Sequence, residues 1–491
     1  MWTKESLSAL VEEKLKDYLF IVVSNREPYI HGFSARQIVV QKPASGLTVA
    51  LDPVMQACGG TWIAHGSGDA DREVVDANNR VRVPTEDPKY WLRRVWLSTR
   101  DVEGYYYGFA NESLWPLCHV AYTRPIFSES NWNAYKRVNG IFADSVLAEI
   151  GDSKAFVFIQ DYHLALLPRM LKERNPKVIV GQFWHIPWPN PEAFRICPWQ
   201  EEIVRGLLGN DLLGFHIRYH RNNFMDTVDQ TVEARVDREI WEVTHQGRRT
   251  AVRPFPISVD FDELDRSSRG EDVNPEISRL KEKLGITDQI VGIGLDRIDY
   301  TKGIPDRFKA LDRFFSRYPE YVGRVVFVQA GVPSRTEVGA YQHLNEEIDN
   351  LVEEVNSRHG NGEWTPIVYL REHESPITLM AMRRMANFCV VSSLHDGMNL
   401  VAKEFPASRS DEDGVLILSR FTGAARELTD ALLVNPYATD DFAEAIRDAV
   451  EMPLEARQRR MRKMREVVRE NNIYKWAADV VSELVKFEFG G

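Results

Sequence analysis

The chain has 491 residues, of which 44% are apolar and 27% charged, so it can build folded domains and is not a disordered polypeptide. Its 61 lysines and arginines against 72 acidic residues give a net charge of −11, which argues against a protein dedicated to nucleic acid. Four cysteines far apart in the sequence form no CxxC pair. They argue against a zinc ribbon or a disulfide scaffold and favour reduced thiols in the cytoplasm.

The first half of the chain predicts a parallel sheet. Residues 1–17 predict an amphipathic helix rather than a signal peptide, because acidic residues interrupt the apolar ones. No apolar run approaches about 18 residues, so we expect no membrane span. Buried strands are predicted at 18–24, 155–160 and 178–184, and a helical pattern separates the last two. Strand, helix and strand at this spacing form a βαβ unit.

The second half repeats this alternation, and the final segment, 454–489, is strongly helical. Strands are predicted at 290–295, 324–330, 367–370, 388–392, 415–419 and 431–435, and helices at 305–317, 337–357, 375–385 and 440–451. Two doubly wound α/β domains follow, with a seam near 253–262. Such a pair predicts a ligand site at the facing carboxyl ends of the strands, the alternative being two unrelated pockets.

The segment 292–303 (GIGLDRIDYTKG) runs from a buried strand into a loop that carries Arg297 and Lys302. A planar guanidinium and a mobile ammonium five residues apart suit a diphosphate. The alternative is a surface ion pair with the aspartates at 296, 299 and 306. The segment partly resembles a dinucleotide fingerprint, but Arg297 stands at the third glycine position, which disfavours an NAD site.

A second segment, 393–404 (SLHDGMNLVAKE), predicts a glycine-containing turn that leads into a helix. The backbone N–H groups of Gly397, Met398 and Asn399 at that helix start suit phosphate oxygens. Asp396 suits either a helix cap or sugar hydroxyls. Glu404, eight residues further along the same helix face, suits a ribose diol.

Histidines and carboxylates follow two neighbouring predicted strands. Asp161 and His163 come after one strand and His185 after the next, so their side chains can share one sheet edge. Structural hydrogen bonding by the histidines is the alternative. His216 and His220 lack an HExxH pattern and predict ordinary helix residues rather than zinc ligands.

A fourth set combines Arg26, the tyrosines at 105–107 and Trp115 with Arg335 from the second half. Cations and aromatic rings together suit a phosphorylated sugar. The alternative is that the aromatic side chains belong to the core.

Read in order, these segments resemble the trehalose-6-phosphate synthase family of retaining glycosyltransferases, family 20. The matching strings span roughly residues 18–488 and include VVSNR, ESLWP, QDYHLALLP, HIPWPNPE, DRIDYTKGIPDR, VPSR, HDGMNLVAKE and GVLILSRFTGAARELTDALLVNPY. The resemblance implies a GT-B fold: an acceptor domain at 1–255, a nucleotide-sugar domain at 256–472 and a helix at 473–491 that returns to the first domain. It also implies transfer of glucose from a nucleoside diphosphate glucose to glucose 6-phosphate, giving α,α-trehalose 6-phosphate.

The resemblance further implies roles for individual residues and a front-face reaction without a protein nucleophile or a metal. Catalytic roles fall to Arg297, Lys302, Asp161, His185 and Asp396. The implied donor-binding residues are Gly46, His185, Arg297, Lys302, Asp396, Gly397, Met398, Asn399, Leu400 and Glu404. The implied acceptor-binding residues are Arg26, Tyr106, Trp115, Asp161 and Arg335. We expect no cofactor, no nucleic acid and no membrane partner, and a homodimer or homotetramer stays open.

The chain departs from the family pattern mainly on the acceptor side. His65 stands where a second tryptophan is usual, Ser45 replaces the first of two glycines, Glu27 follows Arg26, and Trp188 replaces phenylalanine. Glycerol 3-phosphate is therefore an alternative acceptor. A pseudo-glycosyltransferase and a non-catalytic sugar-phosphate sensor are lower alternatives, because the donor-side residues are intact.

Overall fold

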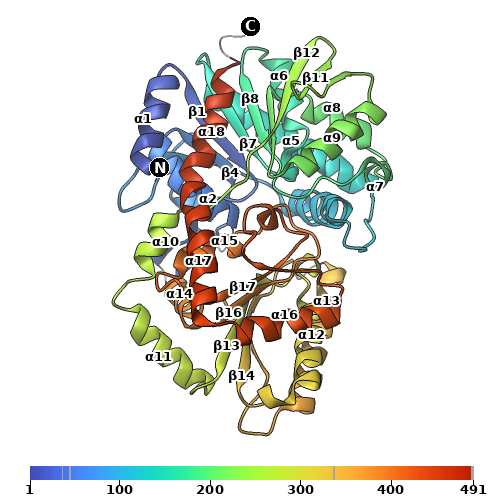
Figure 1. Cartoon of the computed structure of the whole chain (residues 1–491). Helices are drawn as coiled ribbons and strands as arrows, with labels where there is room; N and C mark the ends of the chain where they lie inside the picture. The colour runs from blue at the N-terminus through green and yellow to red at the C-terminus, as the bar shows by residue number, and fades with distance from the viewer. Residues whose placement is uncertain (36, 44–45, 336–337, 488–491) are drawn as a thin grey trace. The chain divides into compact units, whose positions relative to one another are not determined.

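The computed structural model describes residues 1–35, 37–43, 46–335 and 338–487 (Figure 1). By its internal contacts the chain divides into two units. The first unit is Met1–Ile257 together with the chain from Ile473 onward, and the second is Ser258–Asn472.

The described part of the first unit is built on one ten-stranded sheet. Its spatial order is β10-β11-β12-β9-β8-β7-β1-β4-β6-β5. The seven strands from β12 to β6 run parallel, and antiparallel pairs close both edges. The strands are β1 (Leu19–Ser24), β4 (Thr61–His65), β5 (Arg80–Val83), β6 (Tyr90–Val95), β7 (Ala155–Gln160), β8 (Ile179–Phe183), β9 (Leu212–Phe215), β10 (Arg235–Asp237), β11 (Glu242–His245) and β12 (Arg248–Pro254).

Helices and one separate hairpin complete the first unit. The hairpin pairs β2 (Ile30–Ser34) with β3 (Gln37–Gln41). The helices are α1 (Lys4–Lys14), α2 (Gly46–Cys58), α3 (Thr99–Val102), α4 (Trp115–His119), α5 (Glu129–Ile150), α6 (Leu167–Arg174), α7 (Pro191–Phe194), α8 (Gln200–Leu207), α9 (Arg218–Thr231) and α18 (Ile473–Val485), with short 3-10 turns at Asp71–Glu73 and Tyr162–Leu164. A π-helix, Glu103–Leu114, precedes α4 and carries three consecutive tyrosines.

The helix α18 brings the end of the chain back to the first unit. It packs against α1, α2 and β8. Gly181 in β8 leaves room for Leu484, because a Cβ at Gly181 would lie 2.7 Å from Leu484 Cδ2. The helical pattern expected over 454–489 is in fact two helices, since α17 (Leu454–Glu470) ends before α18 begins; residues 488 and 489 lie outside the described residues.

The second unit holds a six-stranded sheet that is parallel throughout. Its order, β15-β14-β13-β16-β17-β18, reverses direction once, between β13 and β16. Numbered within the unit, this is the 3-2-1-4-5-6 order of a Rossmann sheet. The strands are β13 (Ile290–Arg297), β14 (Val325–Val332), β15 (Ile367–Leu370), β16 (Phe388–Val391), β17 (Val415–Ser419) and β18 (Leu432–Val434).

Helices cover the second sheet and bury its apolar residues. They are α10 (Phe261–Ser267), α11 (Val273–Leu284), α12 (Ile304–Arg317), α13 (Gly339–His359), α14 (Pro376–Met385), α15 (Val401–Ser408), α16 (Thr439–Glu451) and α17, with 3-10 turns at Tyr300–Lys302, Pro319–Tyr321 and Gly423–Arg426. One core cluster unites Phe308 and Leu311 of α12 with Phe327 of β14 and Phe442 of α16. Residue 337, the predicted start of the helix observed as α13, lies outside the described residues.

The predicted α/β class and its parallel sheets are confirmed in both units. No helix in the described ranges is long and apolar enough to cross a membrane.

Candidate functional site

In the second unit, the two segments singled out from the sequence meet where the strand order reverses. The loops after β13 and β16 are tied together by the Leu394 N–H, which donates to the Thr301 carbonyl at 2.7 Å. Across this junction, Lys302 Nζ donates to Asp396 Oδ2 at 2.5 Å, and each side chain is only 14% exposed. Reversal points of this kind are where open α/β sheets bind ligands.

Glycine at position 303 is required for this junction. Gly303 has φ +60°, and a Cβ there would lie 2.3 Å from the Ser392 carbonyl oxygen. The hydroxyl of Ser392 donates to the carbonyl oxygens of Lys302 and Gly303, at 3.0 and 2.9 Å. The close approach of the Gly303 backbone to the Ser392 carbonyl therefore fixes the position of Lys302, the residue before the glycine.

Arg297 and Arg335 lie around a fully buried carboxylate, Asp299. Arg335 Nη1 is 3.3 Å from Asp299 Oδ2 and donates to the Tyr341 hydroxyl at 2.5 Å. Burial acts to raise the pKa of Asp299, but the charges of Arg335, Arg297 and Lys302 and the hydrogen bond from the Thr301 N–H together outweigh it and hold the pKa below its usual value. Arg297, at the end of β13, forms no ion pair within 4 Å among the described residues. The sequence grouped Arg335 of the second half with Arg26 and Tyr106 of the first, and Arg335 does belong to the second unit.

The glycines that imitate a dinucleotide fingerprint have packing roles. A Cβ at Gly294 would lie 2.1 Å from Arg307 Nη1, and one at Gly292 would lie 2.3 Å from the Phe388 ring. Arg307 is fully buried and donates to Asp296 Oδ2 at 2.7 Å. These glycines therefore admit a buried arginine and a ring rather than a pyrophosphate.

The helix after Asp396 begins later than the sequence suggested. It starts at Val401 with Leu400 as its N-cap residue, and the side chain of Asn399, with φ +77°, accepts the Ala402 N–H at 3.2 Å. The expectation that Asp396 and Glu404 share one helix face is wrong, because Asp396 lies in the preceding loop. Gly397, Met398 and Asn399 also precede the helix, and Leu400 directly adjoins it. Glu404 itself lies on α15 and pairs with Arg383 of α14.

In the first unit, the strand order reverses between β1 and β7, and three predicted site residues follow the central strands. Asp161 follows β7 with φ +71°, an unusual backbone conformation for a residue other than glycine. Its Oδ1 accepts the N–H groups of Tyr162, at 2.9 Å, and of His185, at 3.2 Å. The loops after β7 and β8 therefore meet, and Arg26 follows β1 at the same edge of the sheet.

His185 is half-buried, and its ring is neutral. It lies 2.9 Å from Gln160 Oε1 through Nε2, and burial lowers its pKa to about 3. The sequence predicted that His216 is a helix residue, and this prediction is wrong. His216 lies between β9 and α9, where its Nε2 contacts the His185 carbonyl at 3.1 Å.

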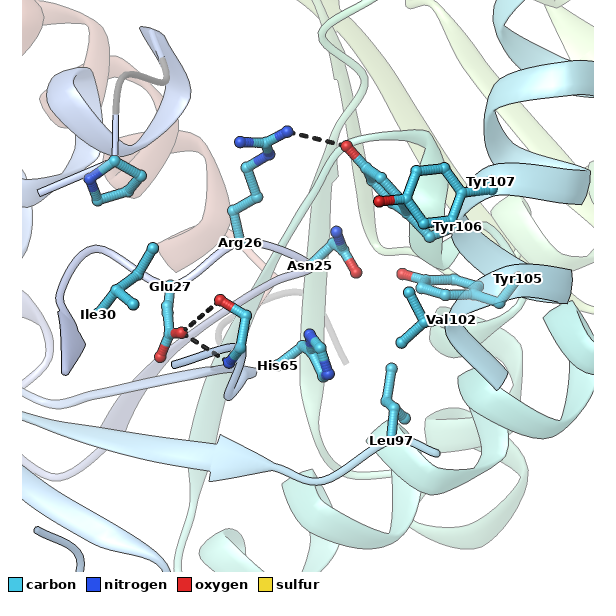
Figure 2. A pocket seen from close by; sticks show the side chains of 12 residues that line it. Asn25, Arg26, Glu27, Ile30, His65, Leu97, Val102, Tyr105, Tyr106 and Tyr107 are labelled. Carbon is cyan, nitrogen blue, oxygen red and sulfur yellow. Dashed lines mark hydrogen bonds between the residues drawn. The ribbon is translucent and has the colours of Figure 1, made fainter. Parts of the chain in front are cut away.

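A cavity of about 180 Å³ opens beside Arg26, within the first unit. Figure 2 shows Arg26 reaching toward the π-helix, where its Nη2 donates to the Tyr106 hydroxyl at 2.9 Å. The Tyr106 ring stacks on His163, with ring centroids 5.7 Å apart. Trp115 is 6% exposed and packs against His119 and Tyr162.

Sequence reasoning missed a buried charge cluster behind this cavity. Arg94 of β6 is 1% exposed and pairs with Glu27 and with Asp71, at 2.5 Å for the latter. Glu27 Oε1 also accepts the Ser67 N–H at 2.8 Å. An acid directly after Arg26 and the acidic stretch near residue 70 were the available signals, but nothing in the sequence pairs them.

Gly46 and Trp188 are two further positions singled out from the sequence. Gly46 is exposed and begins α2, while Ser45 lies outside the described residues. Trp188 is fully buried, and its Nε1 donates to Thr227 at 3.0 Å, so this departure from the family pattern belongs to the core. Among the residues that the structure describes, no group of three or more His, Cys, Asp or Glu is arranged to hold a metal ion.

Known proteins resemble this chain over nearly its whole length. The family model described as Glycosyltransferase family 20 matches residues 18–486. The chain is 39% identical over 478 residues to the bifunctional trehalose-6-phosphate synthase/phosphatase of Thermoproteus tenax, a match that covers 95% of this chain but only 63% of that protein. It is 35% identical over 475 residues to the trehalose-6-phosphate synthase of Mycobacterium avium, with 95% of each chain covered.

Solved structures agree with this similarity. The E. coli protein bound with UDP-2-fluoro glucose superposes with a TM-score of 0.84 at 32% identity, over 95% of this chain and 98% of that chain. The alpha,alpha-trehalose-phosphate synthase (UDP-forming) of Burkholderia xenovorans in complex with glucose-6-phosphate gives 0.85 at 30% identity, over 95% and 99%. These matches confirm the fold class and the resemblance expected from the sequence. The chain belongs to glycosyltransferase family 20.

Proposed function

We propose that this enzyme transfers glucose from UDP-glucose to glucose 6-phosphate and releases UDP and α,α-trehalose 6-phosphate. Its relatives of known structure bind a UDP-glucose analogue and glucose 6-phosphate. The observation that carries the proposal is the pair of Lys302 and Asp396 at the reversal point of the second sheet. A cation and a sugar-binding carboxylate meet there as a nucleotide-sugar donor requires.

On the donor side, Lys302 and Arg297 bind the diphosphate. Lys302 contacts Asp396 when no donor is bound, and Arg297 has no competing ion pair within 4 Å in the described part of the chain. When the donor binds, Lys302 moves from Asp396 to the diphosphate, and the carboxylate of Asp396 then accepts hydrogen bonds from the glucose hydroxyls. Backbone N–H groups from Gly397 to Leu400 line the same loop.

Other donor contacts come from three further positions. Glu404 binds the ribose, and its pairing with Arg383 orients the carboxylate. His185 contacts the donor glucose as a neutral imidazole, because burial lowers its pKa to about 3. Gly46, the first residue of α2, lies over the donor.

The reaction needs no protein nucleophile in this account. Negative charge develops on the leaving diphosphate, and the acceptor proton passes to its oxygen. Fixed positive charge at Lys302 and Arg297 stabilises that state, which is the largest contribution that the protein makes. We propose that no metal takes part, so a chelator should leave turnover unchanged.

On the acceptor side, Arg26 binds the phosphate group with Tyr106 beside it. The guanidinium of Arg26 and the hydroxyl of Tyr106 both line the cavity and are joined by a hydrogen bond before any ligand binds. Trp115, Asp161 and Arg335 complete the acceptor contacts. Asp161 is oriented for this by two backbone N–H donors.

A turnover screen tests the proposal. UDP-, ADP- and GDP-glucose are each combined with glucose 6-phosphate or glycerol 3-phosphate, and nucleotide release and product mass are measured. We expect the greatest turnover with UDP-glucose and glucose 6-phosphate. Preference for glycerol 3-phosphate would make the enzyme a glucosylglycerol-phosphate synthase, and binding without nucleotide release would make it a sensor.

A further inference from the structure

The two carboxylate oxygens of Asp299, in the second unit, hold two different segments of the chain. Oδ1 accepts the N–H of Thr301 at 3.0 Å and its hydroxyl at 2.8 Å. The Lys302 N–H donates to the backbone carbonyl of the same aspartate at 2.9 Å. These bonds fix the 3-10 turn Tyr300–Lys302, so Oδ1 holds the backbone that carries the donor-side lysine.

The second oxygen, Oδ2, holds Arg335. It accepts the hydroxyl of Tyr341 at 2.8 Å and lies 3.3 Å from Arg335 Nη1. The same Nη1 donates to the Tyr341 hydroxyl at 2.5 Å. Carboxylate, hydroxyl and guanidinium therefore contact one another in a closed triangle, and both Asp299 and Tyr341 are fully buried.

This triangle requires a hydroxyl group on residue 341. A hydroxyl can donate to a carboxylate and accept from a guanidinium at the same time, and phenylalanine can do neither. Burial and the charge of Asp299 raise the pKa of Tyr341 well above its usual value, so the hydroxyl keeps the proton that it donates.

The backbone of Arg335 is unusual as well. Its φ is +52°, in the left-handed region that a residue other than glycine seldom adopts. Neighbouring contacts hold this conformation, because the Val338 N–H donates to the Arg335 carbonyl at 2.9 Å and the Ser334 hydroxyl donates to the Ile298 carbonyl at 2.9 Å. Strain of this kind collects where one side chain must be placed for function.

We propose that Asp299 and Tyr341 are positioning residues, and that Asp299 is a shared anchor for Lys302 on the donor side and Arg335 on the acceptor side. This inference rests on the proposed function, in which Arg335 contacts the acceptor. Tyr341 orients the guanidinium toward the acceptor's phosphate without touching the substrate. A guanidinium that is already in place loses less rotamer freedom when the phosphate binds, so its orientation favours acceptor binding.

Removal of one hydroxyl from either side of the Asp299 carboxylate tests the proposal. The full chain is titrated calorimetrically with UDP, and then with glucose 6-phosphate at saturating UDP. Tyr341→Phe should weaken glucose 6-phosphate binding by roughly 5- to 30-fold and leave UDP binding within twofold of the parent. Thr301→Val should show the opposite selectivity, with UDP binding weaker by roughly 3- to 10-fold and glucose 6-phosphate binding unchanged.

Steady-state kinetics and a double-mutant cycle separate positioning from general stability. Tyr341→Phe should raise KM for glucose 6-phosphate at unchanged kcat, because the phosphate contact is equal in the ground and transition states. In an Arg335→Ala background, Tyr341→Phe should change glucose 6-phosphate affinity by less than about twofold, since Tyr341 acts only through Arg335.

Tyr321→Phe is the matched control. Tyr321 is 7% exposed, and its hydroxyl donates to Glu451 Oε1 at 2.6 Å, so this variant also removes a hydroxyl bound to a carboxylate. Tyr321 precedes β14 whereas Arg335 follows it, so the two lie at opposite ends of that strand. Tyr321→Phe should change the affinity for neither ligand.

The failures are distinguishable. Glucose 6-phosphate affinity within twofold of the parent in Tyr341→Phe, or an equal loss with and without Arg335, would overturn the positioning role even if transfer proceeds. Unchanged UDP affinity in Thr301→Val would overturn the shared anchor, and failure of the parent protein to bind glucose 6-phosphate would overturn the proposal as well. The expected selectivity without any glucose transfer would instead contradict the proposed function and support the positioning role.

Discussion

Lys302 is the residue on which the donor-side chemistry depends. Its ammonium is largely buried beside Asp396 and lies at the reversal point of the second sheet. Lys302→Ala should lower kcat by about 10²- to 10³-fold, because a fixed charge is lost where the leaving diphosphate becomes negative. Steady-state kinetics with an unfolding control measure this effect.

Lys309→Ala provides the matched control. Lys309 lies on α12 and pairs with Glu347 at 3.3 Å, with its side chain 48% exposed. Its removal should leave kcat unchanged. Equal turnover in Lys302→Ala and Lys309→Ala would remove Lys302 from the mechanism.

His185 makes stability depend on pH. Its pKa is about 3 in the folded protein and 6.5 as an ordinary histidine, because burial excludes the charged form. Between these values the unfolded chain binds a proton that the folded one does not, so stability falls as the pH falls, by about 1.4 kcal/mol per pH unit. Urea unfolding of His185→Gln from pH 7 to pH 4 should show a shallower slope by about that amount.

The control for that slope is the exposed His343, whose Nδ1 contacts the Gly339 carbonyl. His343→Gln should keep the slope of the parent protein. An unchanged slope in His185→Gln would show that the imidazole is not buried in its neutral form.

At the residue scale, the sequence predicted which groups matter better than how they pair. Lys302 and Asp396 were both identified, but their ion pair joins positions 94 apart and depends on how the strands are ordered. The pairing of Arg94 with Glu27 escaped prediction for the same reason. Tyr105 was grouped with its neighbours, since only the three-dimensional structure shows that its hydroxyl has no hydrogen-bond partner among the described residues.

At the scale of elements, substitution of Gly303 tests how the turn after β13 depends on glycine. Gly303→Ala should destabilise the protein by about 1–2 kcal/mol for its positive φ, and by roughly 1–3 kcal/mol more for the contact with the Ser392 carbonyl. It should also weaken UDP binding, since Lys302 is the adjacent residue. Denaturant unfolding and UDP titration measure the two effects.

Gly285→Ala isolates the backbone cost. Gly285 ends α11 with φ +66°, and a Cβ there would meet nothing within 4 Å. This variant should lose only the smaller amount of stability and keep its UDP affinity. Equal losses in the two variants would mean that the approach to Ser392 does not constrain the turn.

Strands that are apolar along their whole length were predicted closely. The bounds of β7, β15 and β17 agree with the sequence expectation. In contrast, β6 was not identified, because two adjacent arginines are not expected in a buried strand. In the structure, Arg94 is buried there because it pairs with buried acidic residues. The two antiparallel sheet edges were also missed, as hydrophobic periodicity does not show pairing direction.

At the scale of the whole molecule, the end of the chain stabilises the first unit. Trp476 of α18 is 3% exposed, and its ring lies 5.9 Å from that of Phe158 in β7 and 5.2 Å from that of Phe183 in β8. Trp476→Ala should destabilise that unit by about 3–5 kcal/mol. Hydrogen exchange should show faster exchange in peptides from β7 and β8.

Trp364→Ala is the counterpart in the second unit, where Trp364 packs on Phe315 with ring centroids 5.6 Å apart. It should speed exchange in α12 and spare β7. If Trp476→Ala instead affected only peptides from 258–472, α18 would not act as part of the first unit.

The central proposal is that this family member transfers glucose to a sugar phosphate with retention of configuration at the anomeric carbon. The most direct measurement is NMR of the product formed from UDP-glucose labelled with ¹³C at the anomeric carbon and from unlabelled glucose 6-phosphate. We expect stoichiometric UDP and a disaccharide phosphate whose labelled carbon is in an α linkage to the anomeric carbon of the acceptor. A β linkage, labelled free glucose or unreacted donor would contradict it.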